Sequence, residues 1–172
     1  MVELTDQNIA ACERELNSLV TGSDMIAGAV LSTQDGLLVT SASVDRNIEP
    51  DSIAAMSSSL LSLADALAGQ AGKALANNVI SQADSSTLVL LHAGGLILTV
   101  VGQAEINIGL VLTSARRTAH AIDKATKEFG ETVKEREEIA VKGLEMLEHP
   151  EMLLERIKNE MAEMKKRREE RA

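Results

Sequence analysis

Hydrophobic residues recur along the chain with two different spacings, which together predict eight elements. Near the start, Ile9, Cys12, Leu16 and Leu19 lie three or four residues apart, as on the apolar face of a helix, and Thr5 can cap that helix. Short apolar runs bounded by Gly, Asp, Asn and Ser predict strands at residues 25–32, 37–41, 78–83, 88–93 and 96–101. Two further helices are expected at residues 50–75 and 107–129.

The turns between these runs indicate how the strands pair. Asp35-Gly36 and Gly94-Gly95 each separate two apolar runs, and both pairs tolerate the positive φ angles of a tight hairpin. The runs at 88–93 and 96–101 are apolar on both faces, which places them centrally in a sheet. The order helix, two strands, helix, three strands, helix predicts an α+β layered domain with a five-stranded, mostly antiparallel sheet flanked by helices.

Charge divides the chain into two regions. The net charge is −9, yet residues 16–115 contain only eight acidic and two basic side chains, whereas residues 131–172 contain twelve acidic and ten basic ones. The low-charge region must supply the hydrophobic core, and the second region is too polar to form one. We therefore predict a folded domain at residues 1–130, a hinge at Gly130 and a charged helical extension at residues 131–172.

The helix at residues 50–75 carries two apolar stripes where a surface helix needs one. One stripe is mostly large: Ile53, Met56, Leu60, Leu63, Leu67 and Ala71. The other, beside it, is mostly small, and small residues allow close helix packing. Either the helix is central within a monomer, or it packs on its own sheet and against a second copy, with the strand at 78–83 as a pairing edge. The second hypothesis places a homodimer interface at Ser57, Leu61, Ala64, Ala68, Gly72, Val79 and Ser81.

Composition excludes several functions. One Phe and no Trp or Tyr cannot build a base-stacking platform, and an acidic chain opposes a phosphate backbone, so nucleic acid is not an expected partner. The three histidines are scattered, so we expect no metal site, and we expect no cofactor or catalytic residue. We interpret Cys12 as a buried small hydrophobe, His92 as a strand residue with a satisfied ring and His120 as a helix-surface residue.

The first residues, MVELTDQNIA, lack the basic and apolar regions of a signal peptide. The longest apolar tract, residues 87–102, is interrupted by His92 and a Gly-Gly pair and is shorter than a membrane-spanning helix. These features predict a cytoplasmic protein without membrane insertion.

The extension carries a short apolar seam among its charges. Leu154, Ile157, Met161 and Met164 lie three or four residues apart after Pro150, which can begin a new helix. The segment is either a solvated helical tail or a docking arm, and such an arm either packs across the dimer or presents these four side chains to a partner groove.

Three stretches together resemble the roadblock / dynein light chain family. They are GAVLSTQDGLLVTSA at residues 28–42, SIAAMSSSLLSLADALA at residues 52–68 and GQAEINIGLVLTSAR at residues 102–116. The resemblance in element order covers about residues 5–128, and in outline it is nearest to prokaryotic, MglB-like members. It implies a roadblock- and profilin-like fold and a dimeric, non-enzymatic platform that binds a small Ras-like GTPase.

An arginine supplied to the GTPase is one route to faster hydrolysis. Arg46 is the one arginine between residues 15 and 115, Arg116 and Arg117 lie on the third predicted helix, and none of the three is singled out for this role. Two other functions stay open: a scaffold subunit assembled through the helical tail, and a small-ligand sensor.

Overall fold

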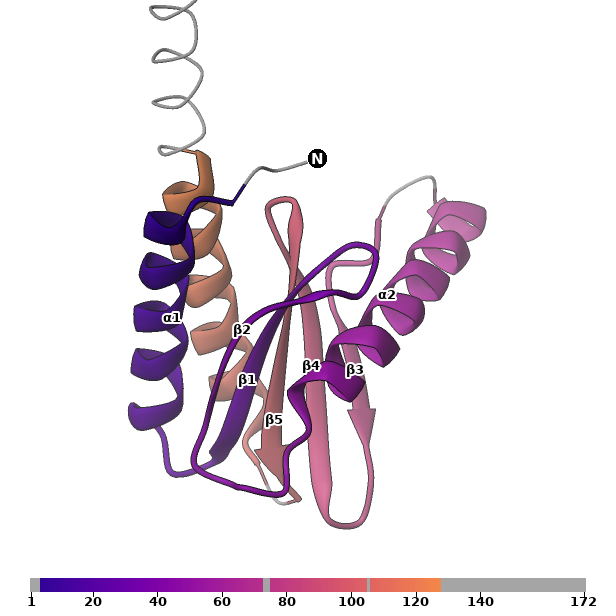
Figure 1. Cartoon of the computed structure of the whole chain (residues 1–172). Coiled ribbons are helices and arrows are strands. Elements are labelled where there is room, and N and C mark those ends of the chain that lie inside the picture. Colours follow the sequence, from indigo (N-terminus) through magenta and orange to yellow (C-terminus); the bar gives the residue numbers. More distant parts are fainter. Residues whose placement is uncertain (1–3, 73–74, 105, 128–172) are drawn as a thin grey trace, which may run out of the picture. The chain divides into compact units, whose positions relative to one another are not determined.

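Figure 1 shows the computed structural model of the chain, which describes residues 4–72, 75–104 and 106–127. The chain divides into two units, Met1–Gly130 and Glu131–Ala172, and every described residue belongs to the first. The elements are α1 (Asp6–Thr21), β1 (Ile26–Thr33), β2 (Leu38–Ser43), α2 (Pro50–Gly72), β3 (Val79–Gln82), β4 (Ser86–Ala93) and β5 (Leu96–Gln103). A final helix covers residues 108–127. The predicted order of elements is confirmed.

The five strands form one antiparallel sheet in the order β2-β1-β5-β4-β3. Strand β5 is central and buried along its length except at Gln103, as its two apolar faces predicted. Strand β3 pairs only with β4 among the described strands and forms an edge, which confirms that prediction as well. The strands extend up to two residues beyond the predicted bounds, because Ala42, Ser43 and Gly102 continue ladders that their low strand propensity concealed.

Two layers of helix enclose the sheet (Figure 1). Helix α1 and the 108–127 helix cover one face, while α2 lies on the other. The α1 side holds the main core, where alternate residues of β1, β4 and β5 meet both helices. Its fully buried members include Cys12 and Leu16 of α1, Leu31, Leu98 and Val100 of the sheet, and Ile122 of the final helix.

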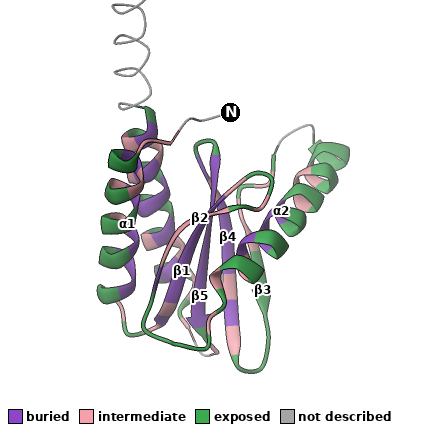
Figure 2. Ribbon diagram, in the orientation of Figure 1, coloured by how far each residue is buried: buried purple, intermediate pink, exposed green. Residues whose placement is uncertain are grey.

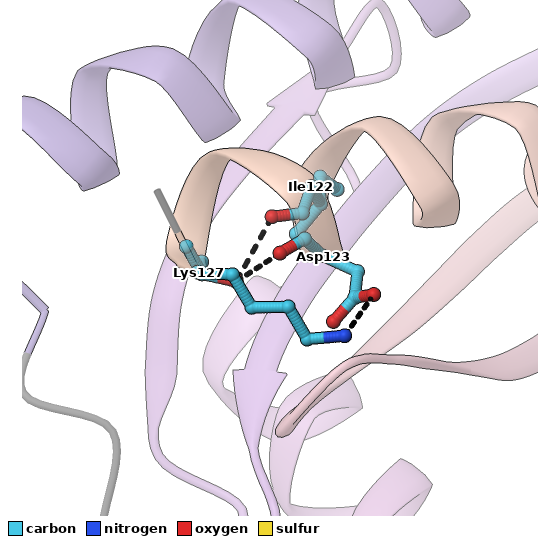
Figure 3. A network of polar contacts seen from close by, with 4 residues as sticks. Ile122, Asp123 and Lys127 are labelled. Carbon is cyan, nitrogen blue, oxygen red and sulfur yellow. Dashed lines mark hydrogen bonds and ion pairs between the residues drawn. The ribbon is translucent and has the colours of Figure 1, made fainter. Parts of the chain in front are cut away.

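Polar side chains fix the ends of the helices on this face. Thr5 precedes α1, accepts a hydrogen bond from Asn8 N at 3.3 Å, and donates its own N–H to Asn8 Oδ1 at 3.2 Å. These two bonds form a capping box and confirm the predicted cap. Asn107 caps the final helix by accepting from Leu110 N at 3.2 Å. Farther along, Lys127 pairs with Asp123 at 2.7 Å on the surface of that helix (Figure 3).

Both predicted hairpins contain a glycine with positive φ: Gly36 at 85° and Gly94 at 65°. In the first turn, Gly36 N donates to Thr33 O at 3.1 Å and Leu37 N to Thr33 Oγ1 at 3.0 Å. A hydrogen bond from the Thr33 side chain also lowers the pKa of the exposed Asp35 carboxyl. The Asp-Gly signal therefore identified a real turn, and the position that needs glycine is its second residue.

Gly94→Ala is expected to lower the free energy of unfolding by about 1–2 kcal/mol, because its φ is left-handed and an added Cβ would overlap the Asp123 carboxylate. Gly69→Ala is the matched control. An added Cβ there meets nothing within 4 Å, and Ala favours the helix, so this change should raise stability by about 0.4–1 kcal/mol. Urea unfolding of both variants measures the difference, and equal effects would contradict the argument.

Candidate protein-binding site

A row of large apolar side chains runs along the solvent side of α2. Met56, Leu60, Leu63 and Leu67 follow one another at intervals of four, three and four residues, and they are 64%, 38%, 59% and 64% exposed. We call these four side chains the α2 stripe. Figure 2 shows α2 mostly in the colour of exposed residues, while the central strands β1 and β5 are mostly buried. Contiguous exposed apolar surface of this kind marks sites of protein association.

The α2 stripe is hollowed near its N-terminal end. A shallow groove of about 480 Å³ is lined by Ala55, Met56, Ser59, Leu60 and Leu63. The lining contains no charged side chain, so the groove fits apolar side chains from another element.

The opposite side of α2 packs on the sheet, and its fully buried residues all lie in the first half of the helix. Ala54, Ser57, Ser58 and Leu61 are buried there, and Leu61 is 0% exposed. Ser58 Oγ donates to Gln34 O of the β1–β2 turn at 2.5 Å. A Cβ at Gly36 would lie 3.1 Å from Ala55 Cα, which shows how closely the helix approaches this turn. Beyond Leu61, no described residue of α2 is fully buried.

Strand β3 has one edge that no other described strand pairs with. Val79 is half-buried, and Ile80, Ser81 and Gln82 are exposed. The strand has no Pro, Lys or other charge, the features that usually protect a sheet edge from pairing. Its backbone groups are therefore available to a further strand.

A polar cluster lies where α2 ends. A cavity of about 510 Å³ is lined by Gln34, Asp65, Leu75, Ala76, Asn77, His92 and Gly94. Within it, His92 Nε2 lies 3.2 Å and 3.1 Å from the two oxygens of the Asp65 carboxylate, which also accepts from Ala76 N at 2.8 Å. The interpretation of His92 as a satisfied strand residue is confirmed.

Residues 10–128 match the protein family described as mitogen-activated protein kinase kinase 1 interacting. The match extends over more than half of the chain. The chain belongs to this family.

Solved structures of MglB and of roadblock/LC7 domains share the fold of this chain, which confirms the predicted roadblock-like fold. MglB from Myxococcus xanthus is 17% identical, with a TM-score of 0.66 over 73% of this chain and 94% of that one. MglB in a tetrameric arrangement is 19% identical, with a TM-score of 0.67 over the same shares. A roadblock/LC7 domain from Streptomyces avermitilis is 25% identical, with a TM-score of 0.58 over 64% of this chain and 92% of that one.

Among curated relatives, the uncharacterized protein MJ0714 of Methanocaldococcus jannaschii is 24% identical over 100 residues. The matched segment is 58% of this chain and 84% of that relative.

Two residues of the predicted dimer interface require a correction. Ser57 and Leu61 are buried against the chain's own sheet, where α2 approaches the β1–β2 turn closely, so they do not form a surface for a partner. Ala64, Ala68 and Val79 are half-buried, and Gly72 and Ser81 are exposed, so their place in an interface stays a prediction. The large side chains of the α2 stripe lie on the solvent side of the helix.

Within the described residues, no group of three or more His, Cys, Asp or Glu side chains could hold a metal ion. Cys12 is buried, as interpreted, and burial followed by the nearby Glu15 charge raises the pKa of its thiol, which opposes a nucleophilic role. His120 is exposed on the final helix, as interpreted. Arg116 donates to Asn78 Oδ1 at 3.1 Å, and Arg46 and Arg117 are exposed. The predicted arm at Leu154, Ile157, Met161 and Met164 lies outside the described residues.

By length and composition, α2 could also cross a membrane, and it is the one helix among the described residues that passes this test. Only 22% of its most apolar window is buried. The helix packs on its own sheet through Ala54, Ser58 and Leu61 and carries Asp65 in its second half, which fits a helix at a protein–protein interface.

Proposed function

We propose that this chain is a non-catalytic regulator of the roadblock type, which forms a homodimer through α2 and β3 and, as a dimer, binds a small Ras-like GTPase. The α2 stripe carries the proposal, because four large apolar side chains are exposed on a folded domain. The likeness to MglB and to roadblock/LC7 domains supports a regulatory role.

A two-fold arrangement uses both exposed features at once. Each copy offers an apolar helix face and a free strand edge, and an isologous interface pairs each feature with its own copy. Antiparallel packing of two α2 helices brings Leu63 or Leu67 of one copy to the groove beside Met56 of the other. The MglB structure with a tetrameric arrangement shows that a chain of this fold self-associates.

In this function the GTPase carries out hydrolysis, and the roadblock dimer acts by repositioning its switch segments. None of Arg46, Arg116 and Arg117 is assigned to the reaction, since Arg116 is engaged with Asn78 and neither Arg46 nor Arg117 lines either cavity described above. We place the dimer in the cytoplasm, where such GTPases act.

Capture on the immobilised 172-residue chain from a lysate of its source cells, with GDP or with a GTP analogue, tests the GTPase half of the proposal. A Ras-like GTPase, identified by mass spectrometry and recovered with one nucleotide only, is the expected result. Recovery of the same proteins with either nucleotide would favour a scaffold subunit. A co-purified metabolite, placed in the 510 Å³ cavity beside Asp65 and His92, would favour a ligand sensor.

A further inference from the structure

The carboxylate of Asp65 joins three segments that are distant in sequence. It belongs to α2, it accepts from Ala76 N in the connection to β3, and it pairs with His92 of β4. Asp65 and His92 are 27 residues apart, and their side chains are only 19% and 24% exposed. A partly buried, charge-assisted contact is stronger than a fully exposed ion pair.

Asp65 lies in the half of α2 that has the fewest buried residues, so its contact with His92 matters for the position of that half. Leu61 is the last fully buried residue of the helix, and Ala64 and Ala68 are only partly buried. The second half of α2 therefore depends on few apolar contacts with the sheet. The same half carries Leu63 and Leu67, two of the four members of the α2 stripe.

We propose that Asp65 and His92 form a polar latch that positions the second half of α2, and through Ala76 the entry to β3, for self-association. The two side chains are positioning residues, since Asp65 faces β4 from α2, His92 lies on β4, and neither belongs to the α2 stripe. The inference rests on the proposed homodimer and adds to it the contact that fixes the orientation of the second half of α2 relative to the sheet. A partner must meet Leu63, Leu67 and the β3 edge together, so the latch orients two parts of one surface.

The experiment removes the latch while leaving the α2 stripe intact. His92→Ala deletes the donor, and His92→Gln restores an N–H donor near the same place. Lys127→Ala is the matched control, because it deletes the Lys127–Asp123 ion pair on the opposite layer (Figure 3). Sedimentation equilibrium of the 172-residue chain gives the dimer dissociation constant, and amide hydrogen exchange followed by mass spectrometry reports local opening.

For His92→Ala we expect a dissociation constant raised about tenfold, the size of effect that one lost hydrogen bond to a charged group produces. Exchange should rise at residues 62–72 and 76–82 and stay unchanged in α1 and the final helix. His92→Gln should recover most of the affinity, and Lys127→Ala should match the original chain. Asp65→Ala combined with His92→Ala should bind no more weakly than Asp65→Ala alone, because Asp65→Ala already removes the contact with His92.

Two outcomes separate failure of the latch from failure of the dimer. A dimer whose dissociation constant and α2 exchange are unchanged by His92→Ala overturns the latch and leaves the proposed function standing. A chain that is monomeric at every concentration overturns the homodimer and, with it, the role of the latch in self-association. In that case, faster exchange of His92→Ala confined to residues 62–72 and 76–82 would show that the contact holds α2 only within the protomer. An equal rise in exchange throughout the domain overturns the latch, because it indicates general destabilisation.

Discussion

Leu61→Ala is expected to lower the free energy of unfolding by about 2–5 kcal/mol, the usual loss when a fully buried leucine leaves a cavity. Leu61 is the one large apolar residue among the four that α2 buries against the sheet, and it is 0% exposed. Its small neighbours Ala54, Ser57 and Ser58 cannot move into the space. Urea unfolding measures the loss. Both chains should carry Leu63→Glu, a change on the α2 stripe that is expected to prevent dimerisation, so that unfolding reports on the protomer alone.

Leu60→Ala, one residue earlier, is the matched control. Leu60 is 38% exposed and belongs to the α2 stripe, so its removal should cost the protomer less than about 1 kcal/mol. In a chain able to dimerise, the same change should weaken association, whereas Leu61→Ala should act on stability. Equal losses of protomer stability for the two leucines would contradict the assignment of the inner and outer sides of α2.

The order of elements could be predicted because the decisive signals are local. Thr5 and Asn107 cap their helices within three residues, and Gly36 and Gly94 supply the positive φ angles of their turns. The doubly apolar run that became β5 also indicated its central place. Each of these signals depends on a few adjacent residues and on backbone geometry that the rest of the fold does not alter.

The orientation of α2 could not be predicted, because both of its sides are apolar. Periodicity shows that two stripes exist, and only tertiary packing decides which one faces the sheet. The close approach of Ala55 to the turn at Gly36 admits small side chains and excludes the large ones. Asp65 was recognisable as a rare charge within α2, but its pairing with His92 depends on how β4 lies beside the helix. Such pairings over long sequence distances are absent from local patterns.

Leu63→Glu is expected to raise the dimer dissociation constant by about 100-fold or more, because an interface of apolar side chains would have to bury an unpaired carboxylate. Leu63 lies in the middle of the α2 stripe and lines the groove beside Met56. It is 59% exposed in the protomer, so the change should alter protomer stability by no more than about 0.5 kcal/mol. Sedimentation equilibrium at micromolar concentration should then give the mass of one chain.

Leu110→Glu is the control for this prediction, because Leu110 is 58% exposed on the final helix, in the layer opposite α2. It adds the same charge at an equally exposed leucine, so any general effect of acidity on association appears in both variants. Only Leu63→Glu should dissociate the dimer, and the loss of the dimer should remove the surface proposed to bind the GTPase. If Leu110→Glu dissociates the dimer equally, or if neither variant dissociates it, the α2 stripe is not the dimer interface. The β3 edge alone would not account for a dimer either, since its four residues offer only a short ladder.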